Sequence, residues 1–244
     1  MIPVENTNIP NRSGMNDGIM ENRSFIVTID GPAGSGKTTV SRLVAERLGF
    51  DYVDTGALYR GVAYAAVHAK IELDDDHALE QMCRSLAIRL DREKDGLHLF
   101  INEVDVSREI RTPAIAMAAS AVSARPVVRQ FLLKLQRHLG HHRKAVFEGR
   151  DMGTVVFPDA EVKFFLDADV KVRAKRRHQE LAGNHNVTLE QVRRDMQCRD
   201  KNDATRDVAP MKVASDAIYV DTADMSIDDV VGLISSTVVG RYRE

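Results

Sequence analysis

The residues with the clearest chemical meaning form an eight-residue stretch, GPAGSGKT, which runs from Gly31 to Thr38. It satisfies the pattern G-x-x-x-x-G-K-[ST], in which glycines let backbone N–H groups turn inward around a phosphate. Lys37 would reach the β- and γ-phosphates of a nucleotide, and the Thr38 hydroxyl would bind Mg²⁺. The predicted contacts to the nucleotide from this stretch are Gly31, Pro32, Ala33, Gly34, Ser35, Gly36, Lys37, Thr38 and Thr39.

The sequence on either side places this loop where the pattern requires it. Phe25–Asp30 is a short apolar run typical of a strand, and Lys37–Leu48 has the apolar period of a helix. A strand, loop and helix in this order indicate a nucleoside triphosphate site at a helix N-terminus. A GTPase is disfavoured because no Asn-Lys-x-Asp run occurs to read guanine, and a motor ATPase because the chain has the length of about one domain.

Four segments downstream of the loop carry arginines beside carboxylates or hydroxyls. They are DTGALYR at Asp54–Arg60, EIRT at Glu109–Thr112, EGRDMGTVVFPDA at Glu148–Ala160 and RDKNDATRD at Arg199–Asp207. Phosphoryl transfer between two phosphorylated substrates needs many fixed positive charges rather than one covalent nucleophile. Arginine suits this task because its planar fork binds a phosphate through two hydrogen bonds and stays charged.

Together with GPAGSGKT, these segments resemble the bacterial-type cytidylate kinases, and the resemblance extends from Phe25 to the C-terminal helix. It implies transfer of the γ-phosphate of ATP, with Mg²⁺, to CMP or dCMP, which gives ADP and CDP or dCDP in pyrimidine nucleotide metabolism. The sequence departs from the family in small ways: Thr38 follows Lys37 where several relatives have glycine and then threonine, and the N-terminal tail is not part of the family pattern. We assign the metal to Thr38, with Thr39 as the alternative hydroxyl.

The resemblance also assigns roles to individual residues. It implies that Arg60, Arg150 and Arg206 bind the phosphate of CMP, and that Arg199 reaches the transferring phosphate or the ribose. The implied catalytic residues are Lys37, Arg150, Arg199 and Arg206. The full set of implied CMP contacts, in which Thr55 and Asp203 lie near the ribose hydroxyls, is Thr55, Tyr59, Arg60, Ser120, Arg129, Arg150, Asp151, Arg199, Asp203 and Arg206.

Recognition of cytosine requires a particular set of polar groups. The base presents its N4 amine as a donor and N3 and O2 as acceptors, so a selective site needs a carboxylate or hydroxyl facing N4 and a cation facing N3 or O2. Asp151, Ser120 and Arg129 match these requirements, and the resemblance assigns them these tasks. For Ser120, a small residue in the run AMAAS, packing alone is the alternative interpretation.

Two other functions compete with this hypothesis. One is a nucleoside monophosphate kinase that acts on UMP or AMP, and the other is a regulator whose loop only senses ATP. The second, arginine-rich set of segments disfavours the sensor. ADP formation that depends on added CMP would distinguish the proposed enzyme from a sensor, and the same assay across a panel of nucleotides would identify a kinase of UMP or AMP.

A helix predicted at Val170–Ala182 carries three arginines within VRAKRRHQE, namely Arg173, Arg176 and Arg177. One interpretation is an ordinary charged helix face exposed to solvent. The alternative is a lid that closes over ATP, contacts its phosphates and excludes water. Gly183 and Asn184 lie where such a lid could turn, and on this interpretation Arg177 contacts ATP.

Compact apolar runs predict the sheet. Besides Phe25–Asp30 they lie at residues 50–53, 144–148, 162–166 and 217–220, separated by segments with helical period. The alternation predicts an α/β fold, a P-loop NTPase domain with a doubly wound parallel sheet of five strands. We expect this kinase domain to span residues 25–244, with a small NMP-binding insertion at about 78–123 and a helical lid region at about 170–206.

The remaining elements follow from helical periods and turn residues. Asp74–Asp76 is expected to cap a helix, Gly96–Val106 is expected to form a small hairpin that turns at Asn102, and Arg199–Asp207 is expected to be flexible. Helices are predicted at Gly56–Lys70, His77–Leu90, Pro113–Ser123, Pro126–Leu139, Val170–Ala182, Leu189–Arg199 and Ile227–Val239.

Composition limits the partners and the compartment. With 34 Lys and Arg against 36 Asp and Glu, the net charge is −2, which gives no basic excess for binding a nucleic-acid polymer. The two cysteines, Cys83 and Cys198, have no CxxC spacing, and no apolar run approaches the length of a membrane span. We expect a cytoplasmic protein with ATP and CMP or dCMP as small-molecule substrates and no membrane partner, and the resemblance implies a monomer.

The first 24 residues are rich in Asn, Gly, Pro and Ser and show no apolar period, so we expect a disordered tail. Deleting residues 1–23 is expected to leave the melting temperature and CMP turnover nearly unchanged, because such a segment buries little apolar surface. Thermal melting and turnover of the truncated and full-length proteins would test this. A clear loss of either property would mean that the segment packs against the domain.

Overall fold

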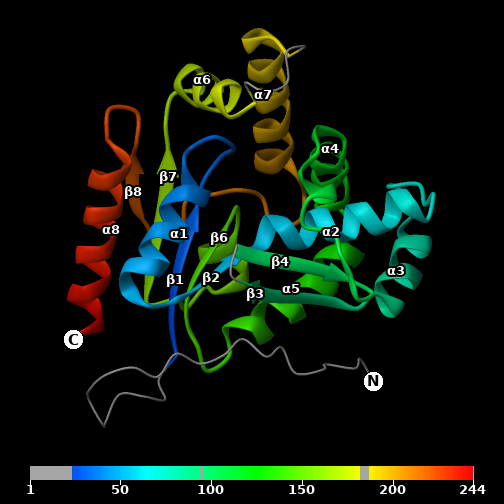
Figure 1. Ribbon diagram of the computed structural model, residues 1–244, viewed down its shortest axis with the longest axis horizontal. Coiled ribbons are helices and arrows are strands. Elements are labelled where there is room, and N and C mark those ends of the chain that lie inside the picture. Colours follow the sequence, from blue (N-terminus) through cyan, green and yellow to red (C-terminus); the bar gives the residue numbers. More distant parts are fainter. Residues whose placement is uncertain (1–23, 94–95, 182–186, 244) are drawn as a thin grey trace. The chain divides into compact units, whose positions relative to one another are not determined.

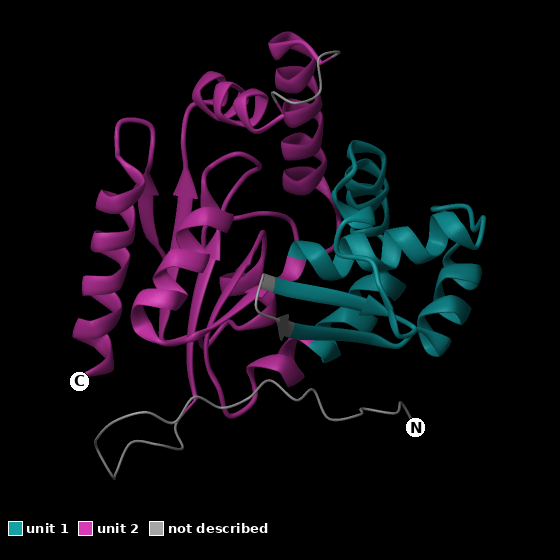
Figure 2. Cartoon of the chain, in the orientation of Figure 1, with its two compact units in different colours: residues 1–22, 56–135 teal, residues 23–55, 136–244 magenta. Residues whose placement is uncertain are grey.

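The computed structural model describes residues 24–93, 96–181 and 187–243. The chain divides into two compact units, which Figure 2 shows in different colours. Residues 56–135 form the smaller unit, and residues 24–55 with 136–243 form the larger one. Residues 1–23 of the predicted tail, and the predicted lid turn at Gly183 and Asn184, lie outside the described residues.

The larger unit is built on a parallel sheet whose strands follow the order β2, β6, β1, β7 and β8 (Figure 1). Their bounds are β1 Phe25–Asp30, β2 Asp51–Asp54, β6 Lys144–Gly149, β7 Val162–Asp167 and β8 Ile218–Asp221. Each neighbouring pair runs in parallel, and the three central strands are almost wholly buried, as expected for apolar strands covered on both faces. The predicted five-stranded parallel sheet is confirmed.

Helices cover both faces of this sheet. Helices α1 (Lys37–Leu48) and α8 (Ile227–Tyr242) pack on one face, and their core includes Val27, Ile29, Val40, Val44, Val146, Phe164, Leu166, Val230 and Ile234. The short π-helix η2 (Met152–Val156) covers the other face, because Gly153 lies against Thr28, whose side chain points away from those of Val27 and Ile29. Because all five strands are parallel, their carboxyl ends lie at the same edge of the sheet.

Two further helices of the larger unit pack against each other. Helix α6 spans Val170–Glu180, helix α7 spans Leu189–Thr205, and Ala174, Val192 and Met196 form their shared apolar core. Helix α7 begins with a capping box, in which the Thr188 hydroxyl accepts from the backbone of Gln191 and the Gln191 side chain accepts from the backbone of Thr188. Both helices fall within the predicted lid region.

Helix α7 continues to Thr205, so the prediction that it ends at Arg199 is wrong, whereas the flexibility of Arg199–Asp207 stays a prediction. Two contacts stabilise the extra turn. Asp203 is buried and accepts a hydrogen bond from Arg150, and the backbone N–H of Arg206 donates to the carbonyl of Asn202. The contact with Arg150 joins parts of the chain 53 residues apart, which the local sequence pattern does not reveal.

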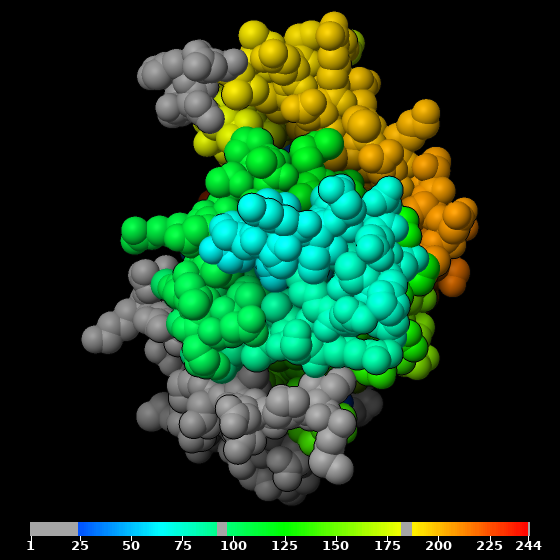
Figure 3. Space-filling model, turned by 90° about the vertical axis from the view of Figure 1, so that its right-hand side faces the viewer, coloured from blue at the N-terminus to red at the C-terminus, as the bar shows by residue number. Residues whose placement is uncertain are grey.

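The smaller unit combines helices with a three-stranded antiparallel sheet, and Figure 3 shows its surface in cyan to green. In chain order its elements are α2 (Thr55–His68), α3 (Asp76–Ser85), β3 (Ile88–Glu93), β4 (Gly96–Ile101), β5 (Val104–Asp105), η1 (Glu109–Arg111), α4 (Pro113–Val122) and α5 (Pro126–Gly140). Helices α2 and α5 continue across the boundary with the larger unit. As predicted, an aspartate caps α3: the Asp75 carboxylate accepts from the backbone of Ala78.

Strand β3 corrects the prediction of one helix over His77–Leu90. Helix α3 ends at Ser85, and Leu86 already has extended dihedral angles. Ile88 and Leu90 alternate with polar residues and pair with β4 opposite Ile101 and Leu99, so the short run forms a strand. The predicted hairpin is present, with its turn at Asn102, and β3 extends it to three strands.

The predicted limits of the insertion, about 78–123, stay a prediction, although the compact unit of residues 56–135 is wider. None of the described helices combines the length and the apolar character that crossing a membrane requires.

Candidate functional site

The predicted phosphate loop joins the carboxyl end of β1 to the start of α1. Two of its positions require glycine. At Gly31 a Cβ would overlap the carbonyl oxygen of Leu166, and at Gly34, where φ is 73°, a Cβ would lie 2.7 Å from Met196 Cε and 3.0 Å from the carbonyl oxygen of Arg173. The loop thus passes too close to β7, α6 and α7 to carry side chains at these two positions.

Lys37 lies within this loop and is 6% exposed. Its Nζ donates to the carbonyl oxygen of Pro32 at 2.6 Å and to Ser35 Oγ at 3.4 Å. Burial, together with the positive charge of Arg150, lowers the pKa of Lys37 to about 7. An anion bound beside Nζ would favour the charged form of Lys37.

Glu148 is a carboxylate beside the phosphate loop that the sequence reasoning did not include among the candidate site residues. It lies near the carboxyl end of β6, is 6% exposed, and its Oε1 accepts a hydrogen bond of 2.9 Å from the Thr38 hydroxyl. The sequence KAVFE shows a carboxylate near the end of an apolar strand, but it does not show that this strand lies beside the loop strand. One carboxylate and one hydroxyl, completed by phosphate oxygens and water, are the kind of oxygen ligands that Mg²⁺ takes, so these residues fit that metal.

Asp30 is a second carboxylate that the sequence reasoning missed. It is the last residue of β1 and 4% exposed, and it accepts hydrogen bonds from the backbone N–H groups of Met152 at 2.9 Å and Gly153 at 2.8 Å. Burial raises its pKa to about 6, although both hydrogen bonds favour the charged form. Asp30 therefore joins the end of β1 to the segment that follows β6.

Four of the predicted CMP contacts form a cluster of two arginines and two carboxylates. Arg150 Nε donates to Asp203 Oδ2 at 3.0 Å, and Arg206 Nη2 donates to Asp151 Oδ1 at 3.2 Å. A longer ion pair of 3.8 Å joins Arg206 to Asp203, and Arg206 Nε donates to the carbonyl of Ala209 at 2.7 Å. The side chains of Arg206 and Asp151 are 5% and 3% exposed, so this pair is almost wholly buried.

Two more predicted contacts lie in the larger unit. The Thr55 hydroxyl is buried and donates to the carbonyl oxygen of Glu148 at 2.6 Å, beside the end of β6. Arg199 lies on α7, one helical turn before Asp203. The structure thus brings Thr55, Arg150, Asp151, Asp203 and Arg206 to the carboxyl ends of the strands or to the end of α7.

The three arginines of α6 differ in their surroundings. Arg173 is buried and donates to the carbonyl oxygens of Ala168 and Ala33, at 2.8 and 3.0 Å, and to Asp200 Oδ2 at 2.5 Å. Asp200 also accepts from the backbone of Ala33 at 3.3 Å, so this pair holds the phosphate loop from α6 and α7.

Arg176 and Arg177 make other contacts. Arg176 donates to the hydroxyl and carbonyl oxygens of Thr222, in the turn after β8, whereas Arg177 forms a partly exposed pair with Glu180 at 2.8 Å. The interpretation of an exposed charged helix face is therefore wrong for the buried Arg173. It describes the surroundings of Arg177, for which ATP contact stays a prediction.

The other four predicted CMP contacts fall in the smaller unit. The Arg129 guanidinium lies 5.5 Å from the centre of the Tyr59 ring and donates to the carbonyl of Ser123 at 3.1 Å. Ser120 Oγ is buried and has no hydrogen-bond partner among the described residues, whereas a buried hydroxyl is normally paired. This orphan hydroxyl favours ligand binding over packing alone. Arg60 is half-buried on α2.

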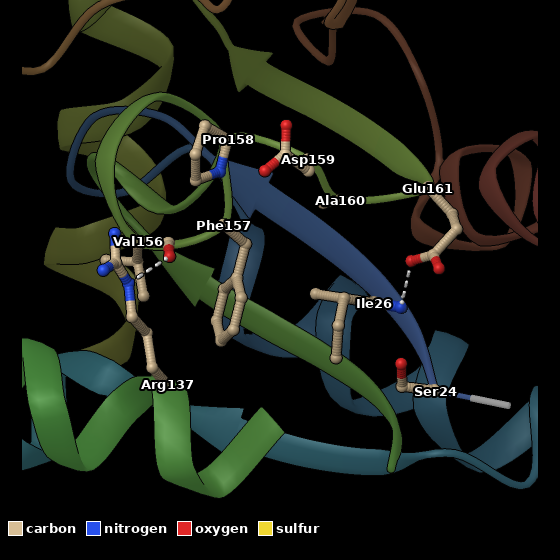
Figure 4. A pocket seen from close by; sticks show the side chains of 9 residues that line it. All are labelled: Ser24, Ile26, Arg137, Val156, Phe157, Pro158, Asp159, Ala160 and Glu161. Carbon is tan, nitrogen blue, oxygen red and sulfur yellow. Dashed lines mark hydrogen bonds between the residues drawn. The ribbon is translucent and has the colours of Figure 1, made fainter. Parts of the chain in front are cut away.

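An open pocket of about 380 Å³ lies at the other end of the sheet (Figure 4). Its lining residues are Ser24, Ile26, Arg137, Val156, Phe157, Pro158, Asp159, Ala160 and Glu161. Glu161 accepts from the backbone of Ile26 at 2.7 Å, and Arg137 donates to the carbonyl of Val156. Because it borders the amino end of β1 and contains no predicted site residue, this pocket is not the candidate site; ligands of parallel sheets bind at the carboxyl ends.

Comparison with known proteins identifies similar chains over nearly the whole length. The family model described as cytidylate kinase matches residues 27–239. A cytidylate kinase of Geobacter sp. (strain M21) is 45% identical over 227 residues, which cover 93% of this chain and 97% of the relative. A cytidylate kinase of Geobacter sulfurreducens is 46% identical over 222 residues, covering 91% and 95%.

Two further comparisons concern architecture. A bifunctional pantoate ligase/cytidylate kinase of Trichormus variabilis is 42% identical over 231 residues, which are 93% of this chain and 42% of that protein. Among solved structures, an uncharacterized protein from Eubacterium ventriosum is similar with a TM-score of 0.51 and 13% identity, covering 89% of this chain and 99% of that one. At this identity the second likeness concerns the fold alone.

Proposed function

The chain belongs to the cytidylate kinase family, and we propose that it transfers the γ-phosphate of ATP to CMP or dCMP, giving ADP and CDP or dCDP. The observation that carries the proposal is the presence of two cationic sets at one edge of the parallel sheet. The phosphate loop follows β1, and Arg150 follows β6. These strands are neighbours whose last residues, Asp30 and Gly149, pair directly. Two adjacent cationic sets suit two phosphorylated substrates.

The chemistry needs positioning and charge stabilisation more than covalent catalysis. Lys37 and the loop backbone bind the β- and γ-phosphates, and Arg150 and Arg206 bind the phosphate of the acceptor. That phosphate has a second pKa of about 6, so at neutral pH its oxygen is already ionised and needs no general base. Lys37 and the arginines then stabilise the charge that spreads over the transferred group.

Thr38 and Glu148 would hold Mg²⁺ when ATP is bound. The metal supplies a positive charge that offsets the charge of the phosphate oxygens during transfer. Glu148 orients the Thr38 hydroxyl by accepting its hydrogen bond at 2.9 Å, which favours Thr38 over Thr39 as the hydroxyl ligand.

The ion pairs prepare the acceptor site in advance. Asp203 accepts from Arg150, and Asp151 accepts from Arg206, so both guanidiniums are held before a nucleotide binds. Fixed guanidiniums lose little conformational freedom on binding and add affinity for that reason. A carboxylate has about four lone-pair sites, so Asp151 can accept from the N4 amine of cytosine while it accepts from Arg206.

Helices α6 and α7 support the proposal of a lid on the ATP side. Arg173 and Asp200 bind the backbone of the phosphate loop at Ala33, so a movement of these helices would be transmitted to the loop. Closure over bound ATP would exclude the water that could otherwise hydrolyse it.

The decisive experiment measures ADP formation with ATP and Mg²⁺ in the presence of CMP, dCMP, UMP or AMP. The proposal expects ADP formation to require a nucleoside monophosphate and to be fastest with CMP or dCMP. Faster turnover of UMP or AMP would identify another nucleoside monophosphate kinase. ADP formation independent of any acceptor, or its absence in all four reactions, would support a sensor or ATPase instead.

Binding of ATP is expected to take up a proton near neutral pH. Because the pKa of Lys37 is lowered to about 7 in the free protein, many of its amines are neutral at pH 7.5. The phosphates raise this pKa, so the complex holds more protons and the Kd for ATP rises as the pH increases above about 7. Calorimetric titration at pH 7.5 in buffers of different ionisation enthalpy should detect roughly half a proton or more per ATP.

Lys37→Ala is the control for this measurement. The variant lacks the amine to which we assign the proton uptake, whereas protonation of ATP itself is the same in both proteins. Equal proton uptake by the wild type and the variant would contradict the assignment to Lys37.

We also propose that the enzyme acts as a monomer in the cytoplasm, on the basis of the family resemblance. Sedimentation velocity with and without CMP tests the first statement, and a dimer at micromolar concentration would contradict it.

A further inference from the structure

Asp30 performs a task that the neighbouring aspartate would ordinarily perform. The π-helix η2 begins after Asp151, and an aspartate in this position commonly accepts a hydrogen bond from the first backbone N–H groups of its own helix. Asp151 makes no such bond. The N–H groups of Met152 and Gly153 are instead bound by the carboxylate of Asp30, at 2.9 and 2.8 Å.

This exchange has a consequence for Asp151. A carboxylate that caps its own helix folds back on the backbone, whereas the Asp151 side chain extends to Arg206 and accepts from its Nη2 at 3.2 Å. The N–H groups of a buried helix start need an acceptor, because leaving them unpaired is costly. Asp30 meets this need from another strand, and Asp151 therefore keeps its side chain for the acceptor site.

The other contacts of η2 hold it at different points. Arg137 donates to the carbonyls of Val155 and Val156, both at 3.1 Å, and Lys163 donates to the carbonyl of Pro158. These bonds fix the far end of the segment. Among the described side chains, Asp30 alone is seen to bind the backbone N–H groups that directly follow Asp151.

We propose that Asp30 is a positioning residue for recognition of the cytidine nucleotide, acting through the backbone of Met152 and Gly153 to hold Asp151 in place. The inference rests on the proposed function, since it assigns Asp151 to the base. It adds a link between the two substrate sites, because Asp30 is also the residue directly before the phosphate loop. The same strand end thus sets the direction of the loop and the position of the base-reading carboxylate.

Asp30→Asn tests the proposal with little change in size. The amide keeps one acceptor, but its NH₂ group faces one of the two backbone N–H groups, so the turn at Met152 must shift. We expect the KM for CMP to rise about tenfold and the CMP to UMP ratio of kcat/KM to fall about fivefold, as for loss of one buried charge-assisted bond. The KM for ATP should change less than the KM for CMP, because the hydrogen bonds that Asp30 makes go to Met152 and Gly153 and not to the phosphate loop.

Glu161→Gln is the matched control. Glu161 also binds a backbone N–H of β1, that of Ile26 at 2.7 Å, but at the opposite end of the strand. This variant should leave both KM values and the CMP to UMP ratio unchanged. If Asp30→Asn behaved like Glu161→Gln, the proposal would be overturned.

A second variant separates position from charge, because Asp30 also favours the charged form of Lys37. Asp30→Glu keeps the negative charge but moves the carboxylate by one methylene. If Asp30 positions the turn, this variant also raises the KM for CMP and lowers the CMP to UMP ratio. If Asp30 acted only through Lys37, Asp30→Glu would resemble the wild type and Asp30→Asn would lower kcat alone, which would contradict the proposal. Since it keeps the buried charge, Asp30→Glu also serves if Asp30→Asn does not fold.

Amide hydrogen exchange provides a measurement that does not depend on the activity. The N–H groups of Met152 and Gly153 should exchange faster in Asp30→Asn than in the wild type and in Glu161→Gln. Unchanged exchange would overturn the positioning role even if the enzyme phosphorylates CMP. In another outcome, the wild type forms no ADP with CMP while the N–H groups of Met152 and Gly153 still exchange faster in Asp30→Asn. That result would support the link from Asp30 to this backbone and would reject the proposed function.

Discussion

Lys37→Ala is expected to lower kcat by about two to three orders of magnitude while the protein remains folded. Lys37 is the ammonium group within the phosphate loop, where it donates to Pro32 and Ser35 in the free protein. During transfer it stabilises charge on the oxygens of the moving phosphoryl group, an interaction that is stronger in the transition state than in the ground state. The loss should therefore appear mainly in kcat.

Stability should not fall with activity in this variant. Burial lowers the pKa of Lys37 to about 7, so keeping this group charged opposes folding, and its removal relieves that cost. Steady-state kinetics with CMP, together with thermal melting, would test both statements. Near-normal turnover would reject the assignment of Lys37.

Lys144→Ala is a suitable control for this experiment. Lys144 is the first residue of β6, the strand next to β1, and therefore lies at the end of the sheet opposite to the phosphate loop. Its Nζ lies 5.1 Å from the centre of the Tyr242 ring. Among the described residues, Tyr242 is the partner seen for this side chain, and it is not a predicted substrate contact. Its replacement should change kcat less than about twofold, since substitutions outside special sites have small effects.

Local patterns predicted the parts of this protein in which neighbouring residues determine the structure. The phosphate loop is one case, because Gly31 and Gly34 make close contacts that any side chain would block. The strands β1, β6 and β7 are another, because a short run buried on both faces is apolar throughout. Strand β3 was wrongly assigned to a helix. Ile88 and Leu90 are compatible with a further helical turn, and only their pairing with β4 shows that they form a strand.

The site itself was predictable only in part. The segments of the sequence singled out Arg150 and Arg206 as candidates, but their partners are distant in sequence: Arg150 pairs with Asp203, and Arg206 with Asp151. Asp30 and Glu148 were missed because each looks like the ordinary end of a strand. Their roles depend on which strands are neighbours, and the order β6, β1, β7 cannot be read from local periodicity.

Asp151→Asn is expected to reduce the preference for CMP over UMP. As a carboxylate, Asp151 can only accept hydrogen bonds, which suits the N4 amine of cytosine and opposes the O4 carbonyl of uracil. The amide keeps the shape but adds a donor that can face O4, so the repulsion that excludes UMP disappears. Loss of a buried charge-assisted bond costs roughly 1.5–3 kcal/mol, so kcat/KM for CMP should fall about tenfold to a hundredfold. The value for UMP should fall far less, or rise.

The ion pair with Arg206 must be considered in this experiment, because Asp151→Asn weakens it as well. Arg206 keeps its bond to the carbonyl of Ala209 and its longer pair with Asp203, so we expect the guanidinium to stay in place. Asp51→Asn provides a matched control: Asp51 also pairs with an arginine, Arg143 at 3.4 Å, at the amino end of β2. That variant should leave the ratio of CMP to UMP unchanged.

Comparison of the two nucleotides then separates base reading from phosphate binding. If Asp151→Asn acted only by displacing Arg206, which we assign to the phosphate, kcat/KM would fall by the same factor for CMP and UMP, since both carry the same phosphate. If Asp151 reads the base, kcat/KM falls for CMP but much less, or not at all, for UMP, and the CMP to UMP ratio falls by about the full factor lost for CMP. An unchanged ratio would exclude Asp151 from base recognition and leave selectivity to Ser120, whose buried hydroxyl has no partner among the described residues, and to Arg129.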